Sequence, residues 1–145
     1  MQTRHSLLLC ALVAGVAACN KPAGQTSSND KAAEDKIVVK IGTANPLTGP
    51  FAHWGRDADD GVKLAVQEAN AEKLVLDGKP ASFEVVSEDD QADPKVATQV
   101  AQRMVDAKVA GIVGHLTSGA AIPASRIYSD AGIPMISGSV TSPSF

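Results

Sequence analysis

Small hydroxyl residues and glycines follow two apolar segments of this chain, at positions where they could bind a small molecule. Ala110–Leu116 is followed by Thr117 and Ser118, and Ile133–Ile136 is followed by the run Ser-Gly-Ser-Val-Thr-Ser over 137–142. Such residues offer hydroxyls and backbone N–H groups as hydrogen-bond partners, but they supply no strong acid or base. The pattern therefore indicates a site that holds a small ligand without transforming it.

Ser118 is the strongest single candidate for a ligand contact. It lies between a predicted strand and a predicted helix, and a helix N-terminus carries about half a positive charge. An anion is favoured there, because the hydroxyl and the free N–H groups point toward it. The alternative is that Ser118 only caps the helix, which is a common role for serine.

An acidic cluster follows the second predicted strand, at Glu88, Asp89, Asp90 and Asp93. A calcium site needs six to eight oxygen ligands at suitable spacing, and the pattern of a calcium-binding loop is absent from the sequence. We therefore expect a solvated loop that ends in a helix cap, and no metal site.

His115 lies at a predicted strand end, close to Ser118 in the sequence. No cysteine or second histidine is spaced to form a metal site with it. An enzyme that used Ser118 with His115 would also need a carboxylate to orient the imidazole, and none is evident from the spacing. We expect a structural histidine, and we expect no enzyme.

The elements that must position these residues alternate between strand and helix. Strands are predicted at 37–43, 82–87, 110–116 and 133–136, and helices at 56–71, 94–108 and 118–130. Asp93 followed by Pro94 is typical of a helix start, and Gly132 of a helix end. This alternation predicts a parallel α/β sheet, in which ligands bind at the carboxyl ends of the strands. Both hydroxyl-rich loops would lie at that edge.

The first residues have the composition of an export signal. Arg4 and His5 precede an apolar run that is too short to cross a membrane, which predicts a signal peptide over 1–18. The run ends Val-Ala-Ala-Cys, which resembles the cleavage box of bacterial lipoproteins, so we expect lipid on Cys19 and a flexible tether over 19–36. The alternative is an ordinary signal peptide, with Cys19 incidental. The expected location is the periplasm or the cell surface.

Composition and motifs exclude several classes of partner. The net charge of −3 provides no basic surface for nucleic acid. Gly42, Asn45 and Gly49 do not form a dinucleotide-binding fingerprint, and no phosphate-binding loop is present, so no cofactor is expected.

Phe145 closely follows a predicted buried strand, and no later helix in the sequence covers that strand. We therefore expect a piece of a longer protein.

Several segments together resemble the leucine/isoleucine/valine-binding protein family, the type I substrate-binding proteins of ABC transporters. The resemblance covers 37–145 and rests on Pro46–Pro50, Trp54-Gly55, Gly61, Ala65, Asn70, Asp89-Asp90, Asp93-Pro94, Gly114–Ser118, Pro123–Tyr128 and Gly132–Ile136. It implies two α/β lobes with an amino acid trapped between them. Residues 37–145 would form an incomplete, Rossmann-like N-terminal lobe with a parallel sheet, and the second lobe is absent from the sequence.

The resemblance also implies which residues bind the ligand. By position, Ser118 would bind the carboxylate through its hydroxyl and N–H, and Thr141 would bind both the carboxylate and the ammonium group. Ser139 would accept an ammonium hydrogen at its backbone carbonyl. Charge-assisted hydrogen bonds of this kind suit a zwitterion.

The same resemblance places Trp54 and Leu116 on the wall of the side-chain pocket. Val140 stands where small residues are common in the family, and it would narrow the site. Well-known members of the family have a disulfide between the positions of Ala92 and Thr117, and both of its cysteines are missing here.

The implied function is the capture of a branched-chain or related amino acid outside the cytoplasm, for delivery to an ABC permease. The protein would contact the membrane only through its lipid anchor. One alternative is a ligand-sensing module of the same fold in signalling. Another is the binding of a different small amino acid, an amide or a related solute.

Overall fold

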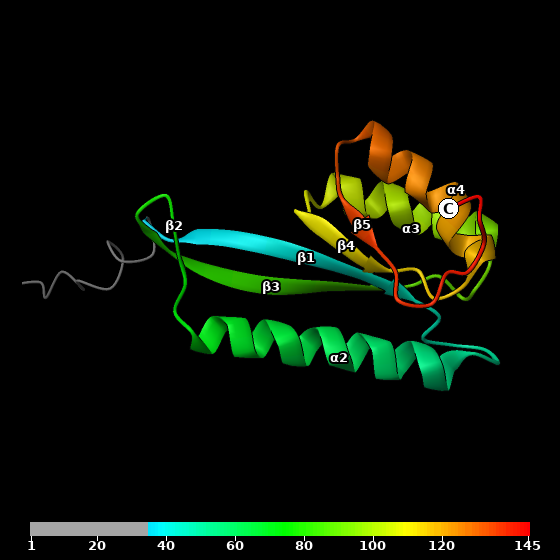
Figure 1. Ribbon diagram of the computed structural model, residues 1–145, viewed down its shortest axis with the longest axis horizontal. Coiled ribbons are helices and arrows are strands. Elements are labelled where there is room, and N and C mark those ends of the chain that lie inside the picture. The colour runs from blue at the N-terminus through cyan, green and yellow to red at the C-terminus, as the bar shows by residue number, and fades with distance from the viewer. Residues whose placement is uncertain (1–34) are drawn as a thin grey trace, which may run out of the picture.

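A computed structural model describes residues 35–145 of the chain (Figure 1). The predicted signal peptide, the lipid on Cys19 and most of the predicted tether lie outside the described residues. Within residues 35–145, no helix combines the length and the apolar character that a membrane crossing requires.

A mostly parallel sheet forms the middle of the structure. Its strands are β1 (Ile37–Asn45), β2 (Val75–Leu76), β3 (Lys79–Asp89), β4 (Gly111–Gly114) and β5 (Met135–Ile136). They lie in the order β2-β3-β1-β4-β5, and only β2 is antiparallel to its neighbour. The helices are α2 (Ala52–Ala71), α3 (Pro94–Asp106) and α4 (Ser118–Asp130). The predicted alternation and parallel sheet are confirmed, and β2 is an addition.

The helices cover the two faces of the sheet unequally. Figure 1 shows α2 running along one face, while α3 and α4 lie together on the other. The main core lies between α3, α4 and the sheet, and small side chains let these layers approach closely. Its buried residues are Ala44, Ala97, Val100, Ala101, Met104, Val109, Ile112, Ala120, Ala124 and Tyr128.

The register brings the carboxyl ends of the strands to one edge. β1 pairs in parallel with β3 on one side and with β4 on the other, and β4 pairs in parallel with β5. The chain therefore continues from β1 to β3 on one side of β1, and it later adds β4 on the other side. The boundary between β1 and β4 is a topological switch point. Ligands of open α/β sheets bind beyond the carboxyl ends of the strands at such a point.

Local sequence signals set the ends of several elements. The Asp93 carboxylate accepts hydrogen bonds from the N–H groups of Lys95 at 2.8 Å and Val96 at 3.0 Å, and so caps α3 as predicted. Gly132 follows α4 with a φ of 70°. Asp77 and Gly78 both have positive φ in the turn between β2 and β3, as a type I′ hairpin requires.

Several predicted boundaries were wrong. Helix α2 begins at Ala52 rather than at Arg56, so Trp54 lies on its first turn and not in a loop. β4 and β5 are shorter than predicted, and the carbonyls of His115 and Leu116, after β4, accept hydrogen bonds from serine hydroxyls. Helix α4 spans Ser118–Asp130 as predicted, but its N-cap is Thr117, so Ser118 is the first helical residue and not the cap.

Candidate functional site

A hollow of about 260 Å³ opens at the carboxyl ends of β1 and β4, at the switch point of the sheet. Asn45 ends β1 and lines it, together with Gly114, His115 and residues that follow β4 and β5. Two of the six predicted ligand contacts, Leu116 and Ser139, lie in its wall.

Two serine hydroxyls join the loops after β4 and β5. Ser137 Oγ donates to the His115 carbonyl at 2.7 Å, and Ser139 Oγ donates to the Leu116 carbonyl at 2.6 Å. The two hydroxyl-rich loops therefore lie side by side, as predicted. Ser137, which directly follows β5, was not among the predicted ligand contacts.

Helix α4 begins two residues after Leu116, which lines this hollow. Ala120 and Ala121 donate their N–H groups to the Thr117 carbonyl, and the first N–H groups of a helix have no partner within it. The Thr117 hydroxyl is buried and lacks a hydrogen-bond partner within residues 35–145. This helix end can therefore offer N–H groups and the Ser118 hydroxyl to an anion.

Four of the six predicted ligand contacts do not line the hollow, namely Trp54, Ser118, Val140 and Thr141. Val140 is half-buried and Thr141 is exposed in the segment after β5. Trp54 is 55% exposed, and its ring lies 4.8 Å from that of His53 and 5.8 Å from that of Phe51. A large aromatic side chain left in solvent at the start of α2 is free to contact a ligand.

Asp89 ties the loop after β1 to the end of β3. Its carboxylate accepts hydrogen bonds from Leu47 N at 2.8 Å, Thr48 Oγ1 at 2.6 Å and Gln91 N at 2.9 Å. Partial burial acts to raise the pKa of Asp89, but hydrogen bonds from Thr48, Gln91 and Leu47 outweigh it, so the pKa lies below its usual value. The sequence did not assign Asp89 this role.

We expect the contribution of Asp89 to disappear in acid. Because its pKa is lowered by folding, its stabilising effect is present above the unfolded value of about 3.9 and is lost as the pH falls through the lower folded value. Melting of the wild type and of Asp89→Asn, followed between pH 7 and pH 2, checks this. The difference in melting temperature should be constant above about pH 5 and should vanish toward pH 2. A difference that persists at pH 2 would contradict this role.

His115 is fully buried and binds two other buried side chains. Its Nδ1 lies 2.6 Å from Asp90 Oδ2, and its Nε2 lies 3.2 Å from the Tyr128 hydroxyl. The expected structural histidine is confirmed. Two expectations were wrong: Asp90 is 0% exposed rather than part of a solvated loop, and a carboxylate does orient His115. The Tyr128 hydroxyl is hydrogen-bonded to Nε2, the nitrogen with which a catalytic serine would have to interact.

The other acids of the cluster are also accounted for. Arg103 makes two hydrogen bonds to Glu88, at 3.1 and 2.7 Å. Within residues 35–145, no group of three or more His, Cys, Asp and Glu side chains could hold a metal ion.

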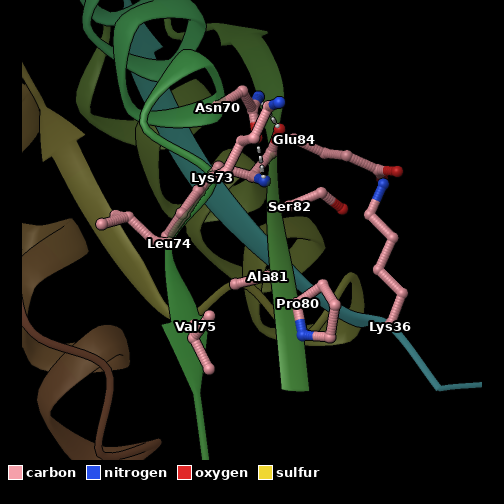
Figure 2. Close-up of a pocket in the computed structure, with 10 residues that line it drawn as sticks. Lys36, Asn70, Lys73, Leu74, Val75, Pro80, Ala81, Ser82 and Glu84 are labelled. Carbon is pink, nitrogen blue, oxygen red and sulfur yellow. Dashed lines mark hydrogen bonds between the residues drawn. The ribbon is translucent and has the colours of Figure 1, made fainter. Parts of the chain in front are cut away.

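A larger hollow of about 610 Å³ lies at the opposite end of the sheet, where β1 and β3 begin (Figure 2). Asn70 forms two hydrogen bonds of 2.8 Å with the backbone of Phe83 there. In Figure 2 the side chains of Lys36 and Glu84 point toward one another. Because this hollow lies at the end of the sheet opposite to the carboxyl ends of the parallel strands, we do not assign the ligand to it.

Comparison with known proteins gives one consistent picture. Residues 38–145 match a family model described as periplasmic binding protein. The chain is 39% identical over 137 residues to the Leu/Ile/Val-binding protein homolog 2 of Brucella abortus, over 94% of this chain and 32% of the relative.

Two solved structures share the fold. The branched-chain amino acid transporter substrate binding protein of Streptococcus pneumoniae, in complex with isoleucine, has a TM-score of 0.66 and 36% identity, over 73% of this chain and 30% of that one. A solute binding protein of an ABC transporter from Rhodopseudomonas palustris, in complex with 3,4-dihydroxybenzoic acid, has a TM-score of 0.62 and 29% identity, over 72% and 28%. The chain thus spans about a third of the length of the relatives it matches.

Proposed function

Because the chain belongs to the periplasmic binding protein family, we propose that the complete protein captures a branched-chain amino acid and delivers it to an ABC permease. The observation that carries this proposal is the pair of joined loops at the carboxyl edge of the sheet, in a fold shared with an isoleucine-bound protein. The proposed role is binding without catalysis, since Tyr128 rather than Ser118 faces the buried imidazole.

In this proposal the loop after β4 binds the ligand carboxylate. Ser118 donates its hydroxyl and N–H at the start of α4, where the helix end adds positive charge. Thr141 bonds the carboxylate and the ammonium group, and the Ser139 carbonyl accepts an ammonium hydrogen. The Ser139 hydroxyl is already used, because it donates to the Leu116 carbonyl, which holds the two loops at a fixed spacing.

The ligand side chain would then lie against Leu116, Trp54 and Val140. Leu116 already lies in the wall of the hollow, and Trp54 is exposed at the start of α2. Burial of each methylene against such a wall contributes about 0.8 kcal/mol, which favours aliphatic side chains over smaller ones.

We further propose an extracytoplasmic protein that is held at a membrane by lipid on Cys19, after removal of residues 1–18. Residues 19–36 would then serve as a tether. The sequence pattern at 16–19 supports this, and mass spectrometry of the mature N-terminus tests it, since an acylated Cys19 adds the mass of its lipid chains.

Titration calorimetry of the complete protein with leucine, isoleucine and valine tests the binding proposal. The Ser118→Ala variant should bind about 10- to 100-fold more weakly, since a hydrogen bond to a charged group contributes about 1.5–3 kcal/mol. Ser129→Ala is a matched control, because Ser129 lies exposed near the other end of α4, and it should bind like the wild type. Failure of the wild type to bind any of the three amino acids would contradict the proposal.

A second candidate ligand is an aromatic acid. The protein from Rhodopseudomonas palustris holds 3,4-dihydroxybenzoic acid in the same fold. Like isoleucine, this compound has a carboxylate, but unlike isoleucine it has no ammonium group. Including it in the titration separates the two candidates, because Thr141 and the Ser139 carbonyl would have no ammonium group to bind.

A further inference from the structure

We propose that Asp90, His115 and Tyr128 form a buried positioning network that holds the ligand-binding loop after β4 in its binding geometry. This inference rests on the proposed function, because it concerns how tightly that loop binds an amino acid. None of the three side chains would touch the ligand, because all three are 0% exposed. They would act through the backbone of residues 115–118.

The network joins three elements at the functional edge of the sheet. Asp90 directly follows β3, His115 directly follows β4, and Tyr128 lies on the last turns of α4. All three side chains are 0% exposed. The imidazole therefore connects the end of one strand to another strand and to the helix whose N-terminus faces the proposed ligand.

The hydrogen-bond partners assign the proton positions. Asp90 Oδ1 accepts from Ala92 N at 2.8 Å, so the carboxylate acts as an acceptor on both oxygens, and its Oδ2 requires a proton on His115 Nδ1. Burial, with the negative charges of Asp90 and Glu88, raises the pKa of Tyr128, which keeps its hydroxyl protonated. With a proton on Nδ1, His115 Nε2 can accept a hydrogen bond from the Tyr128 hydroxyl, and both nitrogens of the imidazole then have a partner.

The backbone next to His115 transmits this order to the site. The carbonyls of His115 and Leu116 accept the hydroxyls of Ser137 and Ser139, which belong to the loop after β5. The Asp90 N–H donates to the Asn45 carbonyl at the end of β1. The same buried group therefore fixes the strand ends that surround the hollow.

A role in positioning explains why these residues are polar. Three apolar side chains could fill the same space without the desolvation cost of a buried carboxylate. Only hydrogen bonds, however, specify the rotation of the imidazole and hence the path of the backbone that leads to Ser118. A fully satisfied buried network of this kind rigidifies its surroundings.

The test uses Asp90→Asn and Tyr128→Phe in the complete protein, with isoleucine and leucine as the probes. Each variant keeps the shape of the side chain and alters the hydrogen bonding. Dissociation constants should rise by about 3- to 30-fold, the range seen for residues that modulate a site without touching its ligand. Asp59→Asn is the matched control, because Asp59 is also a buried carboxylate, on α2 and bonded to Ser87 at 2.7 Å. It should leave the affinity within about twofold of the wild type.

Nuclear magnetic resonance of ¹⁵N-labelled histidine supplies a readout that loss of stability alone does not move. The wild type should show His115 protonated at Nδ1, and Asp90→Asn should shift the proton toward Nε2. If Asp90→Asn does not fold, Tyr128→Phe still decides the question, since its ring packing is retained and its affinity and imidazole shifts can both be measured.

The outcomes separate the two proposals. Wild-type affinity in both variants, or in Tyr128→Phe alone where Asp90→Asn does not fold, overturns the positioning role while leaving the proposed function intact. An Asp59→Asn variant that loses as much affinity as Asp90→Asn also overturns it. A wild-type protein that binds neither amino acid overturns the proposed function, and the positioning role in amino-acid capture with it.

Discussion

Replacing His115 by leucine should lower the free energy of unfolding by about 3–5 kcal/mol. The substitution leaves the Asp90 carboxylate without the Nδ1–H group that lies 2.6 Å away, in a position that is 0% exposed. It also removes the acceptor of the Tyr128 hydroxyl. Loss of one partner from a buried pair is costly, because the remaining charge can reach neither water nor a counter-group. Urea unfolding of the two proteins measures the difference.

A double variant separates the unpaired charge from the lost packing. Combining His115→Leu with Asp90→Asn removes the buried charge, and it should recover part of the stability that His115→Leu alone loses. The opposite result is that the double variant loses further stability, by as much as Asp90→Asn loses alone. That result would show that the unpaired charge of Asp90 is not what destabilises His115→Leu.

Replacing Gly55 by alanine should cost about 3 kcal/mol, the upper end of the range for overpacking. Gly55 is buried in the first turns of α2, and a Cβ there would overlap the Pro46 carbonyl oxygen. Because that atom belongs to the backbone, no side-chain rotation relieves the contact, and the helix start or the loop after β1 must move. The melting temperature of the complete protein measures the effect.

Gly61 on the same helix provides the control. A Cβ there would meet nothing within 4 Å, and alanine is favoured over glycine in a helix by about 0.5–1 kcal/mol. Gly61→Ala should therefore raise the melting temperature while Gly55→Ala lowers it. Equal effects at both positions would show that the approach of α2 to Pro46 is not what requires Gly55.

The effect of Gly55→Ala on ligand affinity provides a second test. The start of α2 carries Trp54, and the loop that Gly55 packs against is held by Asp89. A shift of this region should weaken amino-acid binding as well as stability, whereas Gly61→Ala should leave binding unchanged.

Local patterns predicted the fold well. Spaced apolar residues, the Asp93 cap and Gly132 depend on neighbours a few residues away, and each has its expected place in the structure. They were enough to order the strands and helices. They also placed the two hydroxyl-rich loops at one edge, since parallel strands end on the same side.

The start of α2 was predicted less well. The helix was predicted to begin only at Arg56, after Gly55, but Gly55 lies within α2, where the helix passes close to Pro46. A glycine chosen for close contact cannot be told in the sequence from a glycine chosen for a turn.

The sequence by itself determined the parallel α/β order and placed the two hydroxyl-rich loops at one edge of the sheet. The ligand contacts of Ser118, Ser139 and Thr141 stay predictions. Only the tertiary structure decided that Asp90, 25 residues from His115, is its buried partner, and that Tyr128 completes the group. It also decided which serine hydroxyls are already used within the protein. The physical reason is that periodicity and caps are set by adjacent residues, whereas a buried hydrogen bond exists only once packing has brought distant groups together and excluded water.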